Sequence, residues 1–162
     1  AKENTLFIGS QNGMYIYDIS NPEQPKYVSY YSHVYSCDPV VVDDKYAYVT
    51  LSASSGCGQF TNELQIINIE TLSSPYLVKA YNMTNPKGLG IDSTTLFLCD
   101  NGLKVYDVSN VSNIVLKKHF SIQATDVIPI QNNLLVIGND GLYQYRYNGD
   151  TLSLLSTLLI NP

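Results

Sequence analysis

One pattern recurs four times at intervals of about forty residues, and it constrains the fold of this chain more than any other feature. In each copy, an apolar and aromatic run leads into a polar position just before a turn. The four polar positions are Asp18, Asn68, Asp107 and Arg146. They follow one another after 50, 39 and 39 residues. A fixed period of this length is the signature of a repeat architecture in which each copy is one supersecondary unit.

The longer first interval has a local cause. The segment Leu51 to Glu63 stands where the later copies have the short turns Asp100 to Gly102 and Asn139 to Gly141. We therefore interpret it as a loop insertion within the same kind of repeat.

Each repeat contains up to four strand-like runs separated by Gly, Asn, Asp, Ser or Pro, which predicts one four-stranded propeller blade per repeat. Fourteen Tyr residues and many Val, Ile and Thr favour strands, so we expect an all-β chain that is nearly free of helix. We name the strands a to d from the innermost outward. The predicted runs are 39–43, 88–92 and 127–130 for strand a; 6–8, 46–50, 96–99 and 134–137 for b; 14–21, 64–69, 103–110 and 142–147 for c, with the turn residues included; and 27–31, 77–81, 116–120 and 154–159 for d.

The first repeat lacks a run for its innermost strand. The predicted repeats are about 4–36, 37–85, 86–123 and 124–162, within a single domain over residues 1–162. After the last outer strand only Ile160 to Pro162 remain, which is too few residues to supply the missing strand. We expect the chain to be part of a larger propeller, with several copies that cover one another's open edges as the alternative. Strand b is apolar on both faces in each repeat, as expected where a blade has a neighbour on either side.

The runs Tyr46 to Val49, Gly102 to Ser109 and Asp18 to Pro25 resemble the LVIVD repeat, a propeller-type repeat of bacterial exported and surface proteins. The resemblance covers nearly the whole chain, and the fourth repeat departs from it most. It implies an exported, periplasmic or cell-surface location and a binding or scaffold role. Nothing at Ala1 to Asn4 reads as a signal peptide, so we expect any targeting segment to be absent or removed.

The composition argues against several classes of partner. The net charge is -5 and the sequence has no cluster of Lys or Arg, so nucleic acid and anionic membrane surfaces are poor candidates. No apolar run approaches the roughly 18 residues that a membrane helix needs, which predicts a soluble chain with no membrane span.

No enzyme signature is found in the sequence: it has no phosphate loop, nucleophile elbow, paired-His zinc motif or CxxC pair. We therefore predict no catalytic residue, no metal and no cofactor. Because strands alternate in direction, the d-to-a and b-to-c loops should share one face, which is the candidate binding surface. The repeat alignment gives Asp38, Lys87 and Asp126 one equivalent position at the mouth of the central channel, with His33 nearby as a further ligand-binding candidate. A structural role for these carboxylates, accepting backbone N–H groups, is the competing interpretation.

Other recurring residues have structural explanations. Asp18, Asn68 and Asp107 precede turns and can accept backbone hydrogen bonds as Asx motifs. The recurrent Tyr17, Tyr106 and Tyr145 favour packing between blades over a sugar-stacking platform.

The three cysteines suggest one disulfide. Cys37 begins strand a of the second repeat and Cys57 lies in the insertion of the same repeat, so both should lie on the loop-bearing face and form a bridge in an oxidising compartment. Cys99, at the end of a strand b, aligns with Gly9, Thr50 and Gly138 and reads as a small buried residue.

Two functions from different classes remain open. The leading hypothesis is a non-enzymatic binding or scaffold module of an exported bacterial protein, presenting its loop-bearing face to a protein, glycan or other surface partner. The alternative is a metal-assisted hydrolase or lyase that acts on polysaccharide at the channel mouth.

Overall fold

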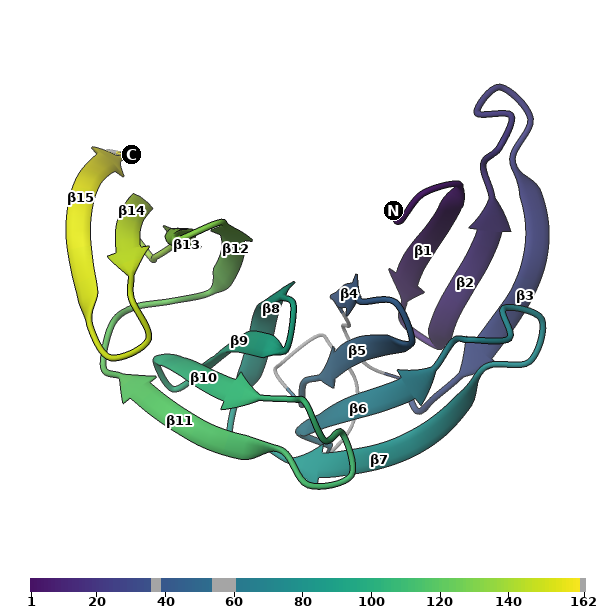
Figure 1. Cartoon of the computed structure of the whole chain (residues 1–162), viewed down its shortest axis with the longest axis horizontal. Coiled ribbons are helices and arrows are strands. Elements are labelled where there is room, and N and C mark those ends of the chain that lie inside the picture. The colour runs from purple at the N-terminus through teal and green to yellow at the C-terminus, as the bar shows by residue number, and fades with distance from the viewer. Residues whose placement is uncertain (36–38, 54–60, 161–162) are drawn as a thin grey trace. The chain divides into compact units, whose positions relative to one another are not determined.

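The fold is built of β-strands joined by short turns. The computed structural model describes residues 1–35, 39–53 and 61–160, and these ranges contain fifteen strands and no helix (Figure 1). In each of four sheets the strands are hydrogen-bonded in the order in which they follow along the chain, and every neighbouring pair is antiparallel. The described part of the chain is therefore a series of β-meanders, which confirms the predicted all-β propeller architecture.

The sheets correspond to the four repeats. Sheet 1 comprises β1 (Thr5–Ser10), β2 (Gly13–Asp18) and β3 (Lys26–Ser32); sheet 2 comprises β4 (Val40–Val42), β5 (Tyr46–Leu51), β6 (Glu63–Asn68) and β7 (Tyr76–Asn82). Sheet 3 comprises β8 (Pro86–Asp92), β9 (Thr95–Asp100), β10 (Leu103–Asp107) and β11 (Val115–Phe120); sheet 4 comprises β12 (Asp126–Ile130), β13 (Asn133–Ile137), β14 (Gly141–Tyr147) and β15 (Leu152–Leu159). Sheet 1 has three strands and lacks the innermost one, as the sequence predicted.

The chain divides into two compact units, Ala1–Asn85 and Pro86–Pro162. The boundary coincides with the predicted limit between the second and third repeats. Unit 1 holds sheets 1 and 2, and unit 2 holds sheets 3 and 4. The single domain predicted over the whole chain stays a prediction.

The turns that follow strand c are held by side chains, as predicted. The carboxylates of Asp18 and Asp107 and the side-chain carbonyl of Asn68 each accept the backbone N–H two residues later, at 2.8, 3.0 and 3.1 Å. Sheet 4 has Arg146 at this position, and its tighter turn is held by Asn148 instead, whose side-chain oxygen accepts the N–H groups of Asp150 and Thr151. The Asx role has thus moved by two residues in the repeat that departs most from the pattern.

A β-bulge recurs in all four sheets where strand c pairs with strand d. The register shifts at Ile16/Tyr17, Ile66/Ile67, Val105/Tyr106 and Gln144/Tyr145, and the extra residue lies in the outer strand each time. An extra residue bends the bulged strand and increases its twist locally. The outer strands therefore bend at one repeated position that the sequence pattern did not indicate.

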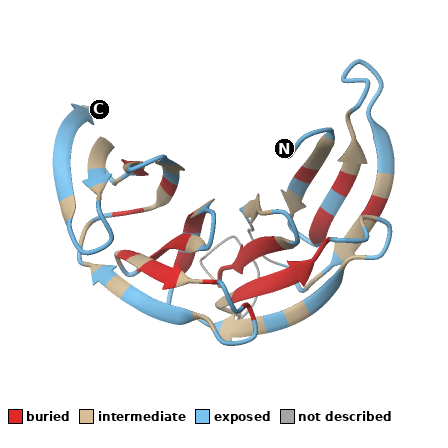
Figure 2. Cartoon of the chain, viewed as in Figure 1, coloured by how far each residue is buried: buried red, intermediate tan, exposed pale blue. Residues whose placement is uncertain are grey.

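Each unit has its own apolar core between its two sheets. Within each unit, we call the side of the first sheet that packs on the second its forward face, and the side of the second sheet that packs on the first its backward face; the other side of each sheet takes the opposite name. In unit 1, Phe7, Met14 and Ile16 of the forward face of sheet 1 pack on Ala47, Val49, Leu51, Ile67 and Ile69 of sheet 2. In unit 2, Phe97, Cys99, Leu103 and Val105 of the forward face of sheet 3 pack on Val127, Leu134 and Val136 of sheet 4. Figure 2 shows the buried positions concentrated on the inner strands, with the outer strands β3, β7, β11 and β15 mostly exposed or intermediate.

The expectation that strand b is covered on both faces is correct for only two of the four sheets. Five of the six residues of β5 and of β9 are buried. In β1 and β13 the burial alternates instead, and Ile8 and Ile137 are 42% and 43% exposed. The prediction was wrong for these two strands, because one face of each stays partly exposed.

Candidate functional site

Two of the predicted site residues lie together where β8 and β12 begin. The backbone N–H of Gly88 donates to the carbonyl oxygen of Thr125 at 2.9 Å, so the chain next to Lys87 runs directly beside the chain next to Asp126. Lys87 is exposed and Asp126 is half-buried. The start of these two innermost strands thus offers an ammonium and a carboxylate close to each other.

The position of Asp126 depends on a glycine opposite it. A Cβ atom on Gly88 would lie 2.1 Å from Asp126 Oδ1 and 2.6 Å from its Cα, distances that atoms do not tolerate. The same Oδ1 accepts the backbone N–H of Val127 at 2.9 Å. The carboxylate therefore lies against bare backbone in a fixed orientation, so the structural role that competed with ligand binding is present as well.

The repeat equivalence predicted for Lys87 and Asp126 is off by one residue. Thr95 pairs with Asp107 in sheet 3 and Asn133 pairs with Arg146 in sheet 4, so sheets 3 and 4 differ by 38 residues up to strand b. Asp126 therefore corresponds to Gly88. The b-to-c turn of sheet 4 has one extra residue, which restores the interval of 39 in strand c and hid the shift from sequence alignment. For the same reason Cys99 corresponds to Ile137 and not to Gly138.

Cys99 lies within electrostatic reach of both charges. It is fully buried, and burial raises the pKa of its thiol to about 12, with the Asp126 carboxylate adding to the rise and Lys87 opposing it. At neutral pH the thiol stays protonated and is a poor nucleophile. The prediction that Cys99 is a small buried residue is confirmed.

The b-to-c turns of unit 2 emerge at the same ends of its sheets and are also polar. Lys104 donates to the buried carboxylate of Asp100 at 2.7 Å, an ion pair that the sequence analysis missed although the two residues flank one short turn. The Tyr143 hydroxyl donates to Asp140 at 2.6 Å. This hydrogen bond is the main reason why the pKa of the Tyr143 phenol is raised, and burial adds to the rise. These contacts hold the turns by side-chain hydrogen bonds.

The remaining predicted site residues belong to the other unit. Asp38, Cys37 and Cys57 lie outside the described residues, so the composite site and the disulfide stay predictions. His33 is half-buried just after β3; its backbone N–H donates to Asn12 O at 3.0 Å, and its ring Nδ1 lies 2.6 Å from Val34 O. These contacts are within its own unit, and a ligand role for His33 also stays a prediction.

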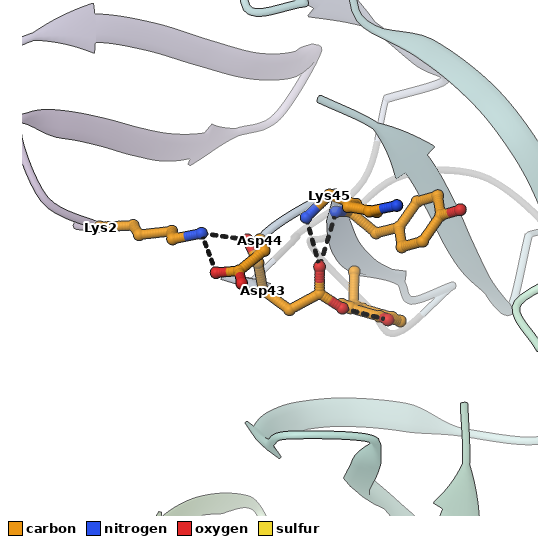
Figure 3. Close-up of polar contacts among 6 residues, drawn as sticks. Lys2, Asp43, Asp44 and Lys45 are labelled. Atoms are coloured by element: carbon orange, nitrogen blue, oxygen red, sulfur yellow. Dashed lines mark hydrogen bonds and ion pairs between the residues drawn. The ribbon is translucent and has the colours of Figure 1, made fainter. Parts of the chain in front are cut away.

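The opposite ends of the sheets carry a pocket in each unit. In unit 1 the pocket of about 180 Å³ is bordered by Lys2, Asp43 and Asp44, and Figure 3 shows Lys2 reaching both Asp44 and the backbone carbonyl of Asp43. The Asp43 carboxylate is occupied by the N–H groups of Lys45 and Tyr46 and by the Tyr48 hydroxyl, at 2.7 to 2.8 Å. In unit 2 the corresponding pocket is about 460 Å³ and is lined by residues that include Phe97, Gln131 and Tyr147.

The described residues include no group of three or more His, Cys, Asp or Glu side chains placed to hold a metal ion. They also include no helix that is long and apolar enough to cross a membrane.

Comparison with protein families gives one match. A model of the LVIVD repeat matches residues 1–32, 36–83 and 98–121, which together make up more than half of the chain. No curated protein matches the sequence significantly.

Several solved structures share the fold. The periplasmic gluconolactonase PpgL of Pseudomonas aeruginosa has 14% sequence identity and a TM-score of 0.69; the alignment covers 97% of this chain and 51% of that one. Apo AztD from Citrobacter koseri has 13% identity and a TM-score of 0.58, with 90% and 42% covered. The WD40 domain of SCAP from fission yeast has 15% identity and a TM-score of 0.56, with 98% and 40% covered. This chain thus spans about half the length of these three structures or less, and identities this low show the fold alone.

Proposed function

Because this chain belongs to the LVIVD repeat family, we propose that it is a non-enzymatic binding or scaffold module of an exported bacterial repeat protein. Its binding surface is the loop-bearing face, where the d-to-a segments and b-to-c turns emerge. The partner is a polar surface, a protein or a glycan, that can pair with both an ammonium and a carboxylate.

The observation that carries this proposal is the placement of Lys87 beside Asp126. Both belong to innermost strands of rigid sheets, and Gly88 and the Val127 N–H fix the carboxylate. An exposed amine and a preoriented carboxylate can bind hydroxyl and amide groups with little loss of side-chain freedom.

The chemistry of the same place argues for binding over catalysis. The Cys99 thiol near the two charges has a pKa of about 12 and is protonated at neutral pH. The described residues offer no metal-binding cluster that would support the alternative of metal-assisted hydrolysis. The likeness to a gluconolactonase rests on 14% identity and supplies no catalytic residue to this chain.

Export is supported by the family and by the periplasmic location named for one structural neighbour. The low charge content, 14% of the residues, suits a partner recognised by neutral hydrogen bonds as well as by charge.

The test is binding of the purified chain to an array of bacterial surface polysaccharides and peptidoglycan fragments, followed by NMR titration with the tightest ligand. We expect chemical-shift changes at Lys87, Gly88 and Asp126. Lys87→Met or Asp126→Asn should weaken binding about tenfold, the effect of losing one charge-assisted hydrogen bond. The matched control is Lys118→Met, because Lys118 lies on the outer strand β11, where it pairs with Asp150, and its loss should not affect binding. Equal binding by all variants would exclude this site.

A further inference from the structure

The two pockets at the opposite ends of the sheets occupy the same place in the repeat. In the first sheet of each unit, the residue that pairs with the Asp of strand c is a threonine, Thr5 or Thr95. In the second sheet, Tyr46 and Asn133 hold the equivalent place opposite strand c. Counted from these pairs, the lining residues that correspond are Lys2 and Asp92, Phe7 and Phe97, Asp44 and Gln131, Ile69 and Tyr147, and Glu70 and Asn148. The two pockets are therefore one site of the repeat with two different linings.

Unit 1 closes this site with its own charges. The Lys2 ammonium donates to the Asp44 carboxylate and, at 3.3 Å, to the backbone carbonyl oxygen of Asp43, so it joins the start of sheet 1 to the a-to-b turn of sheet 2 (Figure 3). Glu70 at the same pocket is paired with Lys45 at 3.7 Å. The volume that remains is about 180 Å³. An ammonium of the chain itself thus occupies the rim of this pocket.

Unit 2 leaves the same site open. Asp92 stands in the place of Lys2, and Gln131 stands in the place of Asp44; a carboxylate and an amide form no ion pair. Asp92 is exposed, and within the described part of the chain its carboxylate accepts one side-chain hydrogen bond, from the Ser93 hydroxyl at 3.3 Å. The volume is about 460 Å³, which is within the range of pockets that hold small ligands. This site therefore has room for a ligand and acceptors to bind it.

The lining of the open pocket is held in place by contacts of its own. The backbone N–H of Tyr147 donates to the Asn132 carbonyl oxygen at 2.9 Å, and the Tyr147 hydroxyl donates to Gly149 O at 3.0 Å. The Tyr147 ring also meets the Phe97 ring in a T-shaped contact at 5.2 Å. A lining that is ordered before a ligand arrives loses little conformational freedom on binding.

The side chains around this pocket suit a neutral ligand with many hydroxyl groups. Of the described residues that line it, only Asp92 and Arg146 are charged, and their charges cancel. The amides of Gln131 and Asn132 each combine a donor and an acceptor, as a hydroxyl group does. Tyr147 adds aromatic surface where unit 1 has an isoleucine. A sugar ring has hydroxyl groups around its edge and CH groups on its faces, so it matches both parts of the lining.

We propose that the pocket of unit 2 is a binding site for a short saccharide. The Asp92 carboxylate accepts hydrogen bonds from adjacent hydroxyl groups, Gln131 binds a further hydroxyl group, and the CH groups of the sugar pack on Tyr147. The site lies at the ends of the sheets opposite to Lys87 and Asp126, so it does not depend on the function proposed above.

NMR titration of the full chain gives the first test. The probes are cellobiose, maltose, lactose and N,N′-diacetylchitobiose, with putrescine and succinate as charged compounds without a sugar ring. At least one disaccharide should shift the backbone amide signals of Asp92, Gln131 and Tyr147. No shift with any disaccharide, or shifts there with a charged compound alone, would overturn the proposal. Shifts confined to Lys87 and Gly88 would assign the sugar to the loop-bearing face and would also overturn it.

Two substitutions at the rim give the second test, measured with the disaccharide that binds most tightly. Asp92→Asn should weaken binding about tenfold, and Gln131→Gly about fivefold, through the loss of hydrogen bonds. Glycine suits this position because the backbone of Gln131 has a φ of 55°, in the left-handed region, so the variant keeps the turn. The matched control is Glu23→Gln, since Glu23 is an exposed carboxylate in a turn of unit 1 that lines neither pocket. Asp92→Asn that binds as tightly as the unaltered chain would overturn the proposal.

A double variant gives the third test by closing the pocket as unit 1 does. Asp92→Lys together with Gln131→Asp places at this site the pair that Lys2 and Asp44 form in unit 1. The disaccharide should no longer bind, while circular dichroism and the thermal melt show the same fold. A folded double variant that binds with unchanged affinity would overturn the proposal, because the sugar would then lie elsewhere.

Discussion

The innermost strand of the second sheet is held differently in the two units. Val40 of β4 and Val127 of β12 occupy equivalent positions and both look back toward the preceding sheet. Val127 is 1% exposed, whereas Val40 is only half-buried. In unit 2 the preceding sheet contributes β8, whose Gly88 and Gly90 let β12 approach closely; in unit 1 the preceding sheet has no innermost strand. An innermost strand is therefore secured by its counterpart in the sheet before it.

The largest effect should come from adding a side chain at Gly90, where β8 and β12 approach each other closely. A Cβ on Gly90 would lie 2.4 Å from Pro129 Cδ and 2.7 Å from the Val127 carbonyl oxygen. Gly90→Val should therefore lower the free energy of unfolding by about 3 kcal/mol, because neither neighbour is a flexible side-chain end. Urea denaturation followed by circular dichroism measures the change. If the variant is as stable as the unaltered chain, β8 and β12 do not hold each other.

The predicted Cys37–Cys57 disulfide would stabilise the innermost strand of sheet 2, which has no innermost strand of sheet 1 beside it. With Cys37 and Cys57 joined, the start of the innermost strand would be fixed to the insertion, and closing a loop of about twenty residues contributes about 3 kcal/mol in the chain-entropy model. The double variant Cys37→Ser with Cys57→Ser should lose this amount under oxidising conditions.

The same bridge can be checked by counting thiols. Protein purified from its natural compartment, unfolded without reductant, should titrate with one free thiol, that of Cys99. Three free thiols would rule out the bridge and the oxidising location inferred from it.

A smaller and more direct contrast compares the two valines. Val127→Ala should cost about 2 kcal/mol, because it removes two methyl groups from a closed core, and Val40→Ala about 1 kcal/mol, because its site is partly open to water. Each variant is the control for the other in one urea series. Equal losses of unfolding free energy would mean that sheet 1 shields β4 from water to the same extent as sheet 3 shields β12.

The smallest effect concerns pH at the opposite ends of the sheets. The Asp107 pKa is lowered by hydrogen bonds from the Ser109 side chain and backbone, and further by Lys117. Because the folded-state pKa lies below the unfolded value of about 3.8, the ionised carboxylate stabilises the fold above that pH and this contribution is lost as the pH falls below it. Asp107→Asn should keep the Asx hydrogen bond, as Asn68 does naturally, and reduce the loss of stability between about pH 4 and pH 2. Acid titration followed by circular dichroism measures this, and an unchanged acid profile would contradict it.

Much of the fold could be predicted because turn residues mark the ends of the strands. Gly, Asn and Asp delimit each run, so the predicted and observed strands differ by one or two residues at most ends, and the absence of an innermost strand in the first repeat was visible as the absence of a run. Asx positions such as Asp18 could be predicted because their hydrogen bonds are local.

Pairing between strands was not predictable in the same way. The repeated bulges, and the one-residue error in aligning Lys87 with Asp126, depend on which residues face each other across neighbouring strands. The sequence of one strand does not contain this information. Gly88 and Gly90 were an available signal, since glycine inside a strand often marks a close approach of another backbone. Arg146 was noticed as an exception in strand c, but its place on an exposed face became apparent only with the sheet register.

The meander topology has a consequence for how the chain acquires its structure. Every strand pairs only with strands adjacent in sequence, so each sheet is a contiguous segment and its hydrogen bonds close short loops. During synthesis, a sheet can form as soon as its own segment has left the ribosome, and the core of unit 1 can close before the residues of unit 2 exist.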